Sequence, residues 1–318
     1  MVGAVSLHHV VGDTASMTQA SHGGDQTLKA VSLMTAGMVF VPLGDSFAKL
    51  VVESTSYSSF AVAWARFVLG MLIALPLAAF LGSFKDLKGQ FIIAQVLRGS
   101  LLSGTIVCII TAVGKVPLAD AYGAFFVGPA VATLLARFVL GETVRRFQWW
   151  ALLFGFVGVV LVLKPSAAIA PGQLWALSAG CFYGAYLTAT RWASSVGPPL
   201  AQLAGQLCVG TILLAPYGCG ELMSFEFQSP AYLFGSGVCS ALGNLLAISA
   251  FGFARAATLT PLVYFQLIAV TVLGYFVFRD FPDAVTGAGL LIILLAGASP
   301  LYLHNRRSGS IHKPTSGK

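Results

Sequence analysis

Runs of about twenty consecutive apolar residues follow one another through almost the whole of this 318-residue chain. A helix with a rise of about 1.5 Å per residue and that length spans the hydrocarbon core of a bilayer. Hydrophobic residues make up 57% of the chain and charged residues only 9%, whereas soluble domains carry about 25% charged residues. The sequence therefore predicts an integral membrane protein whose function is performed within the bilayer.

The apolar runs predict ten transmembrane helices. Barrel strands are about ten residues long and alternate in polarity, whereas these runs are apolar on every side, so only backbone that is hydrogen-bonded within each segment suits them. The predicted fold class is an all-α integral membrane protein. The expected spans are 31–50, 58–81, 91–113, 118–140, 147–163, 172–191, 199–219, 229–253, 258–278 and 282–303.

Basic residues indicate the orientation, because cytoplasmic loops carry an excess of Lys and Arg. With a cytoplasmic N-terminus, most flanking basic residues fall inside, and the outer segments hold only Lys49, Lys115, Lys164 and Arg279. Both termini are therefore predicted to be cytoplasmic. The net charge of +7 follows largely from this asymmetry, so no nucleic acid partner is expected.

An internal repeat organises the chain. Residues 116–158 align without gaps with residues 254–296, and earlier in each half Gly70 meets Gly210. Each half would hold five spans, an odd number, so the second half would enter the membrane from the opposite side, as in the inverted repeats of secondary transporters. The predicted divisions are a flexible cytoplasmic tail (1–29), a first five-helix repeat (30–165), a second (166–304) and a basic cytoplasmic tail (305–318).

The motifs PLADA (117–121) and LGETV (140–144) in the first half, and FRDFPD (278–283) in the second, resemble those of the drug/metabolite transporter superfamily, EamA branch. GDSFAKLV (44–51) and WARF (64–67) resemble the subset that takes up cofactors, S-adenosylmethionine or riboflavin. The resemblance implies ten helices, an inverted repeat and carriage of a small organic metabolite. Together with the lack of a targeting segment, it also implies a location in the plasma (inner) membrane. The second half has Arg-Asp where the family usually has Gly-Glu, so symmetric roles for the two acids are not implied.

Charges inside apolar spans are the strongest site candidates, since each costs a few kcal/mol unless it is paired or hydrated. Arg66 and Asp45 lie at compatible depths, roughly 12 Å and 9 Å from the outer ends of their helices. One interpretation is that Arg66 binds an anionic group of the cargo through its planar fork, with Asp45 as its alternating partner or a proton carrier. The other is a permanent structural ion pair between two helices.

Other charges have two interpretations each. Arg98 either lines the cavity or extends to the cytoplasmic interface. Arg137 either extends to that interface or belongs to a gate or an ion pair. Lys49 either anchors its helix at the outer interface or accompanies Asp45 in substrate binding, as the family resemblance implies. Glu142 is predicted in an ion-pair cluster at a helix end or an inner gate, and Asp120 as a cap at a helix N-terminus or part of a gate.

Aromatic and amide side chains supply the remaining candidates for substrate binding. Tyr183 and Tyr186 share one face of the sixth span, and Tyr264 lies in the ninth. These rings either receive a planar cargo or pack against other helices and lipid. Asn244 and Gln206 are amides inside spans, where an amide needs partners.

The motif inventory narrows the classes of function. The chain has no HExxH, GxSxG, P-loop or CxxC motif, so we expect no enzyme activity, no cofactor and no metal site. A secondary transporter of a small polar metabolite (an amino acid, S-adenosylmethionine, riboflavin or a similar compound) is the prediction, working by alternating access. A channel, a lipid scramblase and an integral-membrane enzyme remain alternatives. The expected partners are the cargo and the lipid bilayer, with a proton as coupled ion and a homodimer left open.

Overall fold

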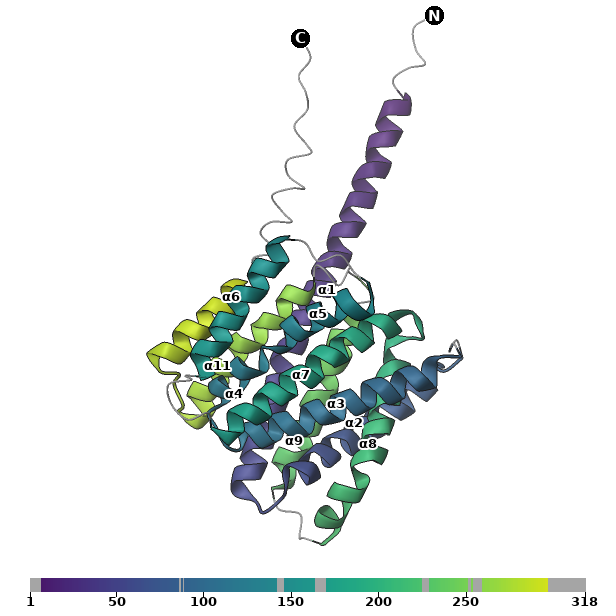
Figure 1. The fold of residues 1–318 in the computed structure, drawn as a ribbon. Helices are drawn as coiled ribbons and strands as arrows, with labels where there is room; N and C mark the ends of the chain where they lie inside the picture. The colour runs from purple at the N-terminus through teal and green to yellow at the C-terminus, as the bar shows by residue number, and fades with distance from the viewer. Residues whose placement is uncertain are drawn as a thin grey trace, which may run out of the picture.

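The computed structural model describes residues 7–85, 87, 89–141, 146–163, 170–224, 229–250, 253 and 259–296, which form helices packed side by side without a strand (Figure 1). The helices are α1 (Leu7–Ser54), α2 (Ser59–Phe80), α3 (Phe91–Val113), α4 (Leu118–Phe125), α5 (Gly128–Val139), α6 (Arg146–Leu163), α7 (Pro171–Trp192), α8 (Pro199–Ser224), α9 (Pro230–Ala250), α11 (Phe265–Phe278) and an unlabelled helix (Ala284–Ala296). Two short 3₁₀ helices are also present: η1 (Ala193–Ser195) follows α7, and η2 (Thr260–Tyr264) precedes α11.

The described helices confirm a multi-pass, all-helical membrane protein. Six segments within the described ranges are long and apolar enough to cross a bilayer by themselves: Gln26–Ser54, Ser59–Phe80, Phe91–Val113, Leu118–Val139, Pro199–Leu222 and Pro230–Ala250. Each of them overlaps a span expected from the sequence. Shorter apolar helices lie at Leu152–Leu163, Leu262–Phe278 and Ala284–Ala296.

Local chemistry explains where several helices begin and end. The Ser58 hydroxyl accepts the backbone N–H of Ala61, which satisfies a free donor in the first turn of α2. Pro171 opens α7 at the first helical position, where its missing N–H costs nothing. Arg279 ends α11 in the left-handed conformation, at φ 58°. The residues at these three boundaries thus explain where α2 and α7 begin and where α11 ends.

Two of the expected spans are interrupted rather than continuous. The span predicted at 118–140 is divided into α4 and α5 at Phe126 and Val127, because Pro129 has no N–H to donate to the carbonyl of Phe125. The span predicted at 258–278 begins as the 3₁₀ turn η2, which contains Pro261, and becomes α-helical only at Phe265. The two prolines predict possible kinks in these spans, and the structure has a full interruption at each.

The first helix starts earlier than the expected boundary. We predicted a flexible tail over residues 1–29, whereas α1 is helical from Leu7 and projects beyond the bundle (Figure 1). No proline lies between Leu7 and Val41, so nothing interrupts the backbone hydrogen bonds of that stretch. The predicted C-terminal tail at 305–318 lies outside the described residues.

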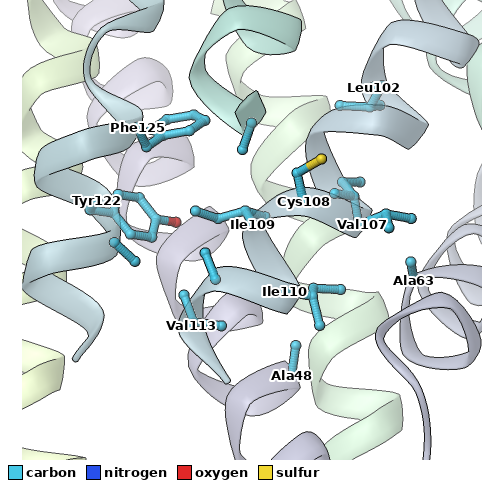
Figure 2. Close-up of a cluster of buried hydrophobic side chains, with 14 of the residues drawn as sticks. Ala48, Ala63, Leu102, Val107, Cys108, Ile109, Ile110, Val113, Tyr122 and Phe125 are labelled. Carbon is cyan, nitrogen blue, oxygen red and sulfur yellow. The ribbon is translucent and has the colours of Figure 1, made fainter. Parts of the chain in front are cut away.

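Helices of the two halves pack against each other across the bundle. The most extensive helix pairs are α1 with α9, α2 with α8 and α3 with α7. Glycines allow some of these backbones to approach closely, because a Cβ at Gly37 on α1 would lie 2.8 Å from the carbonyl oxygen of Gly243 on α9. Between α3 and α4 the core is apolar, and Figure 2 shows Tyr122 and Phe125 of α4 beside Ile109 of α3.

Candidate functional site

A cavity of about 80 Å³ lies between α1, α2, α3, α4, α7, α9 and α11. Most of its lining is apolar, from Leu, Ile, Val, Met and aromatic side chains. Its polar lining residues are Asp45, Arg66, Thr105, Tyr122, Tyr183, Tyr186, Thr190, Ser240, Asn244 and Gln266. A mainly apolar hollow with a few convergent polar groups is typical of a site for a small organic ligand.

An ion pair lies at one end of this cavity. Asp45 on α1 accepts a hydrogen bond from Nη1 of Arg66 on α2 at 2.5 Å, and its other oxygen accepts the hydroxyl of Tyr122 on α4 at 2.5 Å. Asp45 and Arg66 are each only 3% exposed. Three helices are thus joined through a single carboxylate, and Nε of Arg66 has no partner among the described residues.

Aromatic rings form one wall of the cavity. Tyr183 and Tyr186 on α7 lie with ring centroids 6.1 Å apart, and Phe125 on α4 lies 5.0 Å from Tyr183. Near this wall, Phe126 pairs with Tyr264 of η2 at 5.2 Å, although Tyr264 is not a lining residue. The rings offer apolar faces that suit a planar group, and their hydroxyls can hydrogen-bond a polar one.

Amide groups lie on the side of the cavity formed by the second half of the chain. Asn244 on α9 donates to the carbonyl of Ser240 at 2.9 Å. Gln266 on α11 is buried, its amide nitrogen donates to the sulfur of Met38 at 3.2 Å, and its oxygen has no partner among the described residues. The free acceptor is available to a donor on a ligand.

Arg98 and Gln206, both predicted for the site, lie behind the aromatic wall and not on the cavity surface. Arg98 is fully buried, so it does not extend to the interface as one interpretation had it. Its guanidinium lies 5.6 Å from the Tyr186 ring centroid, and Oε1 of Gln206 accepts the Tyr186 hydroxyl at 3.2 Å.

The end of the bundle where α1 and α3 terminate is closed. Ala48, Ile110 and Val113 pack there beyond Tyr122 (Figure 2). Lys49 is 4% exposed and lies 3.6 Å from Asp280. Lys49 is also 3.7 Å from Glu53 and lies over the ring of Phe278. Lys49 is therefore a buried link between α1 and the end of α11, and it does not line the cavity.

The remaining predicted residues lie away from the cavity. Asp120, in the first turn of α4, accepts the hydroxyl of Thr286 at 3.1 Å beside the Lys49 link, an arrangement compatible with capping and with a gate. Arg137 is exposed in the last turn of α5. Glu142 lies outside the described residues.

Tyr122 and Gln266 are site residues that sequence reasoning missed. Gln266 is a polar residue inside an apolar span, so the rule that singled out Asn244 could have found it. Tyr122 stands one residue after the PLADA motif, but its contact with Asp45 depends on the packing of α4 against α1. No local sequence pattern could have indicated that contact.

The fold and the site together define a class of protein: a membrane-spanning helical bundle with an enclosed, mostly apolar cavity and a buried ion pair. The EamA-like transporter family matches residues 28–164 and again 170–298. The chain belongs to the EamA-like transporter family, within the drug/metabolite transporter superfamily.

Curated relatives are similar at low identity over most of their length. An S-adenosylmethionine uptake transporter of Rickettsia bellii is 26% identical over 78% of this chain and 85% of its own. A riboflavin transporter of Vibrio cholerae is 25% identical over 85% and 91%. The pseudopaline exporter CntI of Pseudomonas aeruginosa is 26% identical over 66% and 75%.

A solved structure has the same fold. The superposition covers 86% of this chain and 98% of that protein, with a TM-score of 0.62 and 18% sequence identity. At that identity the likeness concerns the fold alone.

Proposed function

We propose that the chain is a secondary transporter that moves a small polar organic metabolite by alternating access between two inverted five-helix repeats. The observation that carries the proposal is the cavity inside the bundle, which stops short of the end bearing the Lys49 link. On α1 and α3 the lining residues begin at Met34 and Leu102 and stop at Asp45 and Ile109. A site accessible from one side at a time is what alternating access requires.

Contacts between the halves support an inverted repeat. The alignment of the halves makes α1 equivalent to α7 and α3 equivalent to α9, so the pairs α1–α9 and α3–α7 are equivalent contacts. It also pairs Gly70 with Gly210, and hence Phe67 with Leu207. A Cβ at Gly70 would lie 3.2 Å from Leu207, and one at Gly210 would collide with Phe67, so the contacts are reciprocal.

The interrupted helices fall at matching places in the two repeats. Aligning 116–158 with 254–296 puts Phe126 against Tyr264, the residues at which the two spans change conformation. The rings of these two residues contact each other. A residue that contacts its own repeat mate lies beside a two-fold axis, which supports the symmetry.

The cargo we propose carries an α-ammonium and an α-carboxylate on a partly planar body. Asp45 can pair with the ammonium of a zwitterion and Arg66 with its carboxylate. The ion pair within the protein is then replaced by two ion pairs between the protein and the cargo. The aromatic wall supplies the apolar surface. Amino acids and S-adenosylmethionine have the charged groups and riboflavin has the planar ring, so all three belong in the test panel.

The proposal includes a plasma-membrane location, which follows the family resemblance, with both ends in the cytoplasm, which the distribution of basic residues supports. The closed end then faces outward, and the cavity lies on the cytoplasmic side of the closure. Transport, not catalysis, is the proposed activity.

Counterflow in proteoliposomes tests the function. Vesicles preloaded with one unlabelled compound from the panel should accumulate the same labelled compound transiently and saturably. Arg66→Lys should lose transport by about tenfold or more although it keeps the charge, because Lys lacks the planar fork. Arg146→Lys, at an exposed position in the first turn of α6, is the matched control. Flux without saturation or counterflow would contradict a carrier and favour a channel.

A further inference from the structure

A second buried guanidinium, that of Arg98 on α3, has only neutral hydrogen-bond partners. Its Nε donates to the hydroxyl of Thr190 on α7 at 3.1 Å, and its Nη1 donates to the amide oxygens of Gln95 at 3.0 Å and Gln202 at 2.8 Å. The face of Tyr186 completes the surroundings. Arg98 is 0% exposed, so water does not compensate its charge.

No carboxylate balances this cation in the part of the chain that the structure describes. Asp45, the acid that lines the cavity, is occupied by Arg66 and Tyr122. Other ion pairs of the described residues join Lys49 to Glu53 and Asp280, at the closed end. A buried charge without a counter-charge is strongly unfavourable, and more so inside a membrane. The site therefore lacks a negative charge.

The polar atoms that are left over around Arg98 are all donors. Nη2 of Arg98, Nε2 of Gln95 and Nε2 of Gln206 are buried without a partner among the described residues. The acceptors of the same cluster are in use, since the oxygens of Gln95 and Gln202 face Arg98 and that of Gln206 faces Tyr186. Three free donors beside an unbalanced cation match an anion.

The packing fixes these donors next to the cavity. A Cβ at Gly205 on α8 would lie 2.6 Å from the side chain of Gln95, and one at Gly99 on α3 would lie 2.9 Å from the carbonyl oxygen of Gln206. These helices are therefore in close contact at the level of the cluster. Tyr186 and Thr190, which both contact Arg98, line the cavity, so the cluster lies directly behind these two cavity-lining side chains.

We propose that Arg98, Gln95 and Gln206 form an anion-binding subsite at the edge of the cavity, separate from the Arg66–Asp45 pair. Its ligand is a monovalent anion, either the carboxylate of the cargo or a free chloride ion that binds with it. The assignment of the cavity as a transport site rests on the proposed function, but binding of the anion does not require transport.

Thermal unfolding of the purified full-length protein in lipid nanodiscs tests the subsite directly. Sodium chloride and sodium acetate are titrated separately, with the ionic strength held constant by the bulky sulfonate MES. The melting temperature of the wild type and of the exposed control Arg146→Gln should rise saturably with at least one of the two ions. Arg98→Gln should need about tenfold or more of the anion for the same rise, because the charged donor is gone.

A second variant keeps the test decisive if Arg98→Gln does not fold. Gln95→Glu places a carboxylate where an amide oxygen already accepts from Arg98, and so supplies the missing charge from within the protein. Its melting temperature without added anion should exceed that of the wild type and should no longer respond to chloride or acetate. An undiminished anion response in Gln95→Glu, or no saturable response in the wild type, would overturn the subsite.

The source of the anion is separated by adding S-adenosylmethionine to protein saturated with chloride. Shifts in melting temperature that add indicate chloride bound beside the cargo, and shifts that do not add indicate that the cargo carboxylate occupies the subsite. Failure of the proposed function is distinguishable, because it would abolish counterflow for the whole panel while leaving the response to chloride or acetate in place.

Discussion

Two arginines lie fully inside the same bundle, and they differ in what faces them. Arg66 meets a carboxylate that is also held by a tyrosine hydroxyl, whereas Arg98 meets two amides and a threonine. Arg66 and Asp45 neutralise each other without a ligand, so replacing either one leaves an uncompensated charge. Arg98 has no counter-charge among the described residues, so replacing it with a neutral residue removes an uncompensated charge. In the described part of the chain, the same residue type thus holds helices together through its own counter-charge in one place and lacks a counter-charge in the other.

The largest effect is expected from Asp45→Asn. It leaves the buried guanidinium of Arg66 without its counter-charge, which costs about 3–5 kcal/mol when one partner of a buried pair is removed. Chemical unfolding in nanodiscs or mixed micelles measures the loss. The double variant Asp45→Asn/Arg66→Gln should recover most of the stability without transport, and a single variant as stable as the wild type would contradict a closed pair.

Tyr122→Phe should have the next largest effect. It removes the hydroxyl that donates to Asp45 and keeps the ring, so we expect a loss of about 2 kcal/mol, typical of a hydrogen bond to a charged group. The same unfolding measurement serves. Tyr264→Phe is a suitable control, because it also removes one hydroxyl near the aromatic wall. Equal losses in the two variants would argue against a special role for Tyr122.

Arg98→Gln should leave the stability unchanged or raise it in the absence of added anions, because it removes a buried charge that has no counter-charge within the described ranges and Gln can still donate to its neighbours. The comparison between the two arginines depends on this asymmetry. A loss as large as that of Asp45→Asn would mean that Arg98 has a negatively charged partner.

Lys49→Gln should cause the smallest loss of stability, about 0.5 kcal/mol, because its acidic partners are nearly half exposed and remain hydrated when the amine is removed. If the link to Asp280 helps to close one end of the cavity, the rate of counterflow should change more than the stability does. Asp280→Asn should reproduce the change in rate. An unchanged rate in both variants would assign the link to packing alone.

Depth along a helix made the Arg66–Asp45 pair predictable, since both residues lie at similar distances from the expected helix ends. Depth also suggested that Arg98 could reach the interface, and there the reasoning failed. Whether a long side chain extends to water depends on which helices cover it, and α7 and α8 cover Arg98 through contacts between residues about a hundred positions apart. That information is absent from any local pattern.

The spans themselves were predictable, because a membrane imposes a length and a polarity on every helix. The interruptions at Phe126 and Tyr264 were indicated by Pro129 and Pro261, but a proline alone does not distinguish a kink from a break. The helical start of α1 at Leu7 was missed because a polar, glycine-containing stretch has weak helix propensity.

The close packing of α7 against α4 and α5 also limits which substitutions this sequence can accept during evolution. A Cβ at Gly180 would collide with the carbonyl oxygen of Phe125, and one at Gly184 would lie 2.5 Å from that of Gly128. The opposing atoms are main chain, so no compensating substitution can remove them. In a library of random variants these two positions should accept glycine alone, while Leu174, on the exposed side of the same helix, should accept almost any apolar residue.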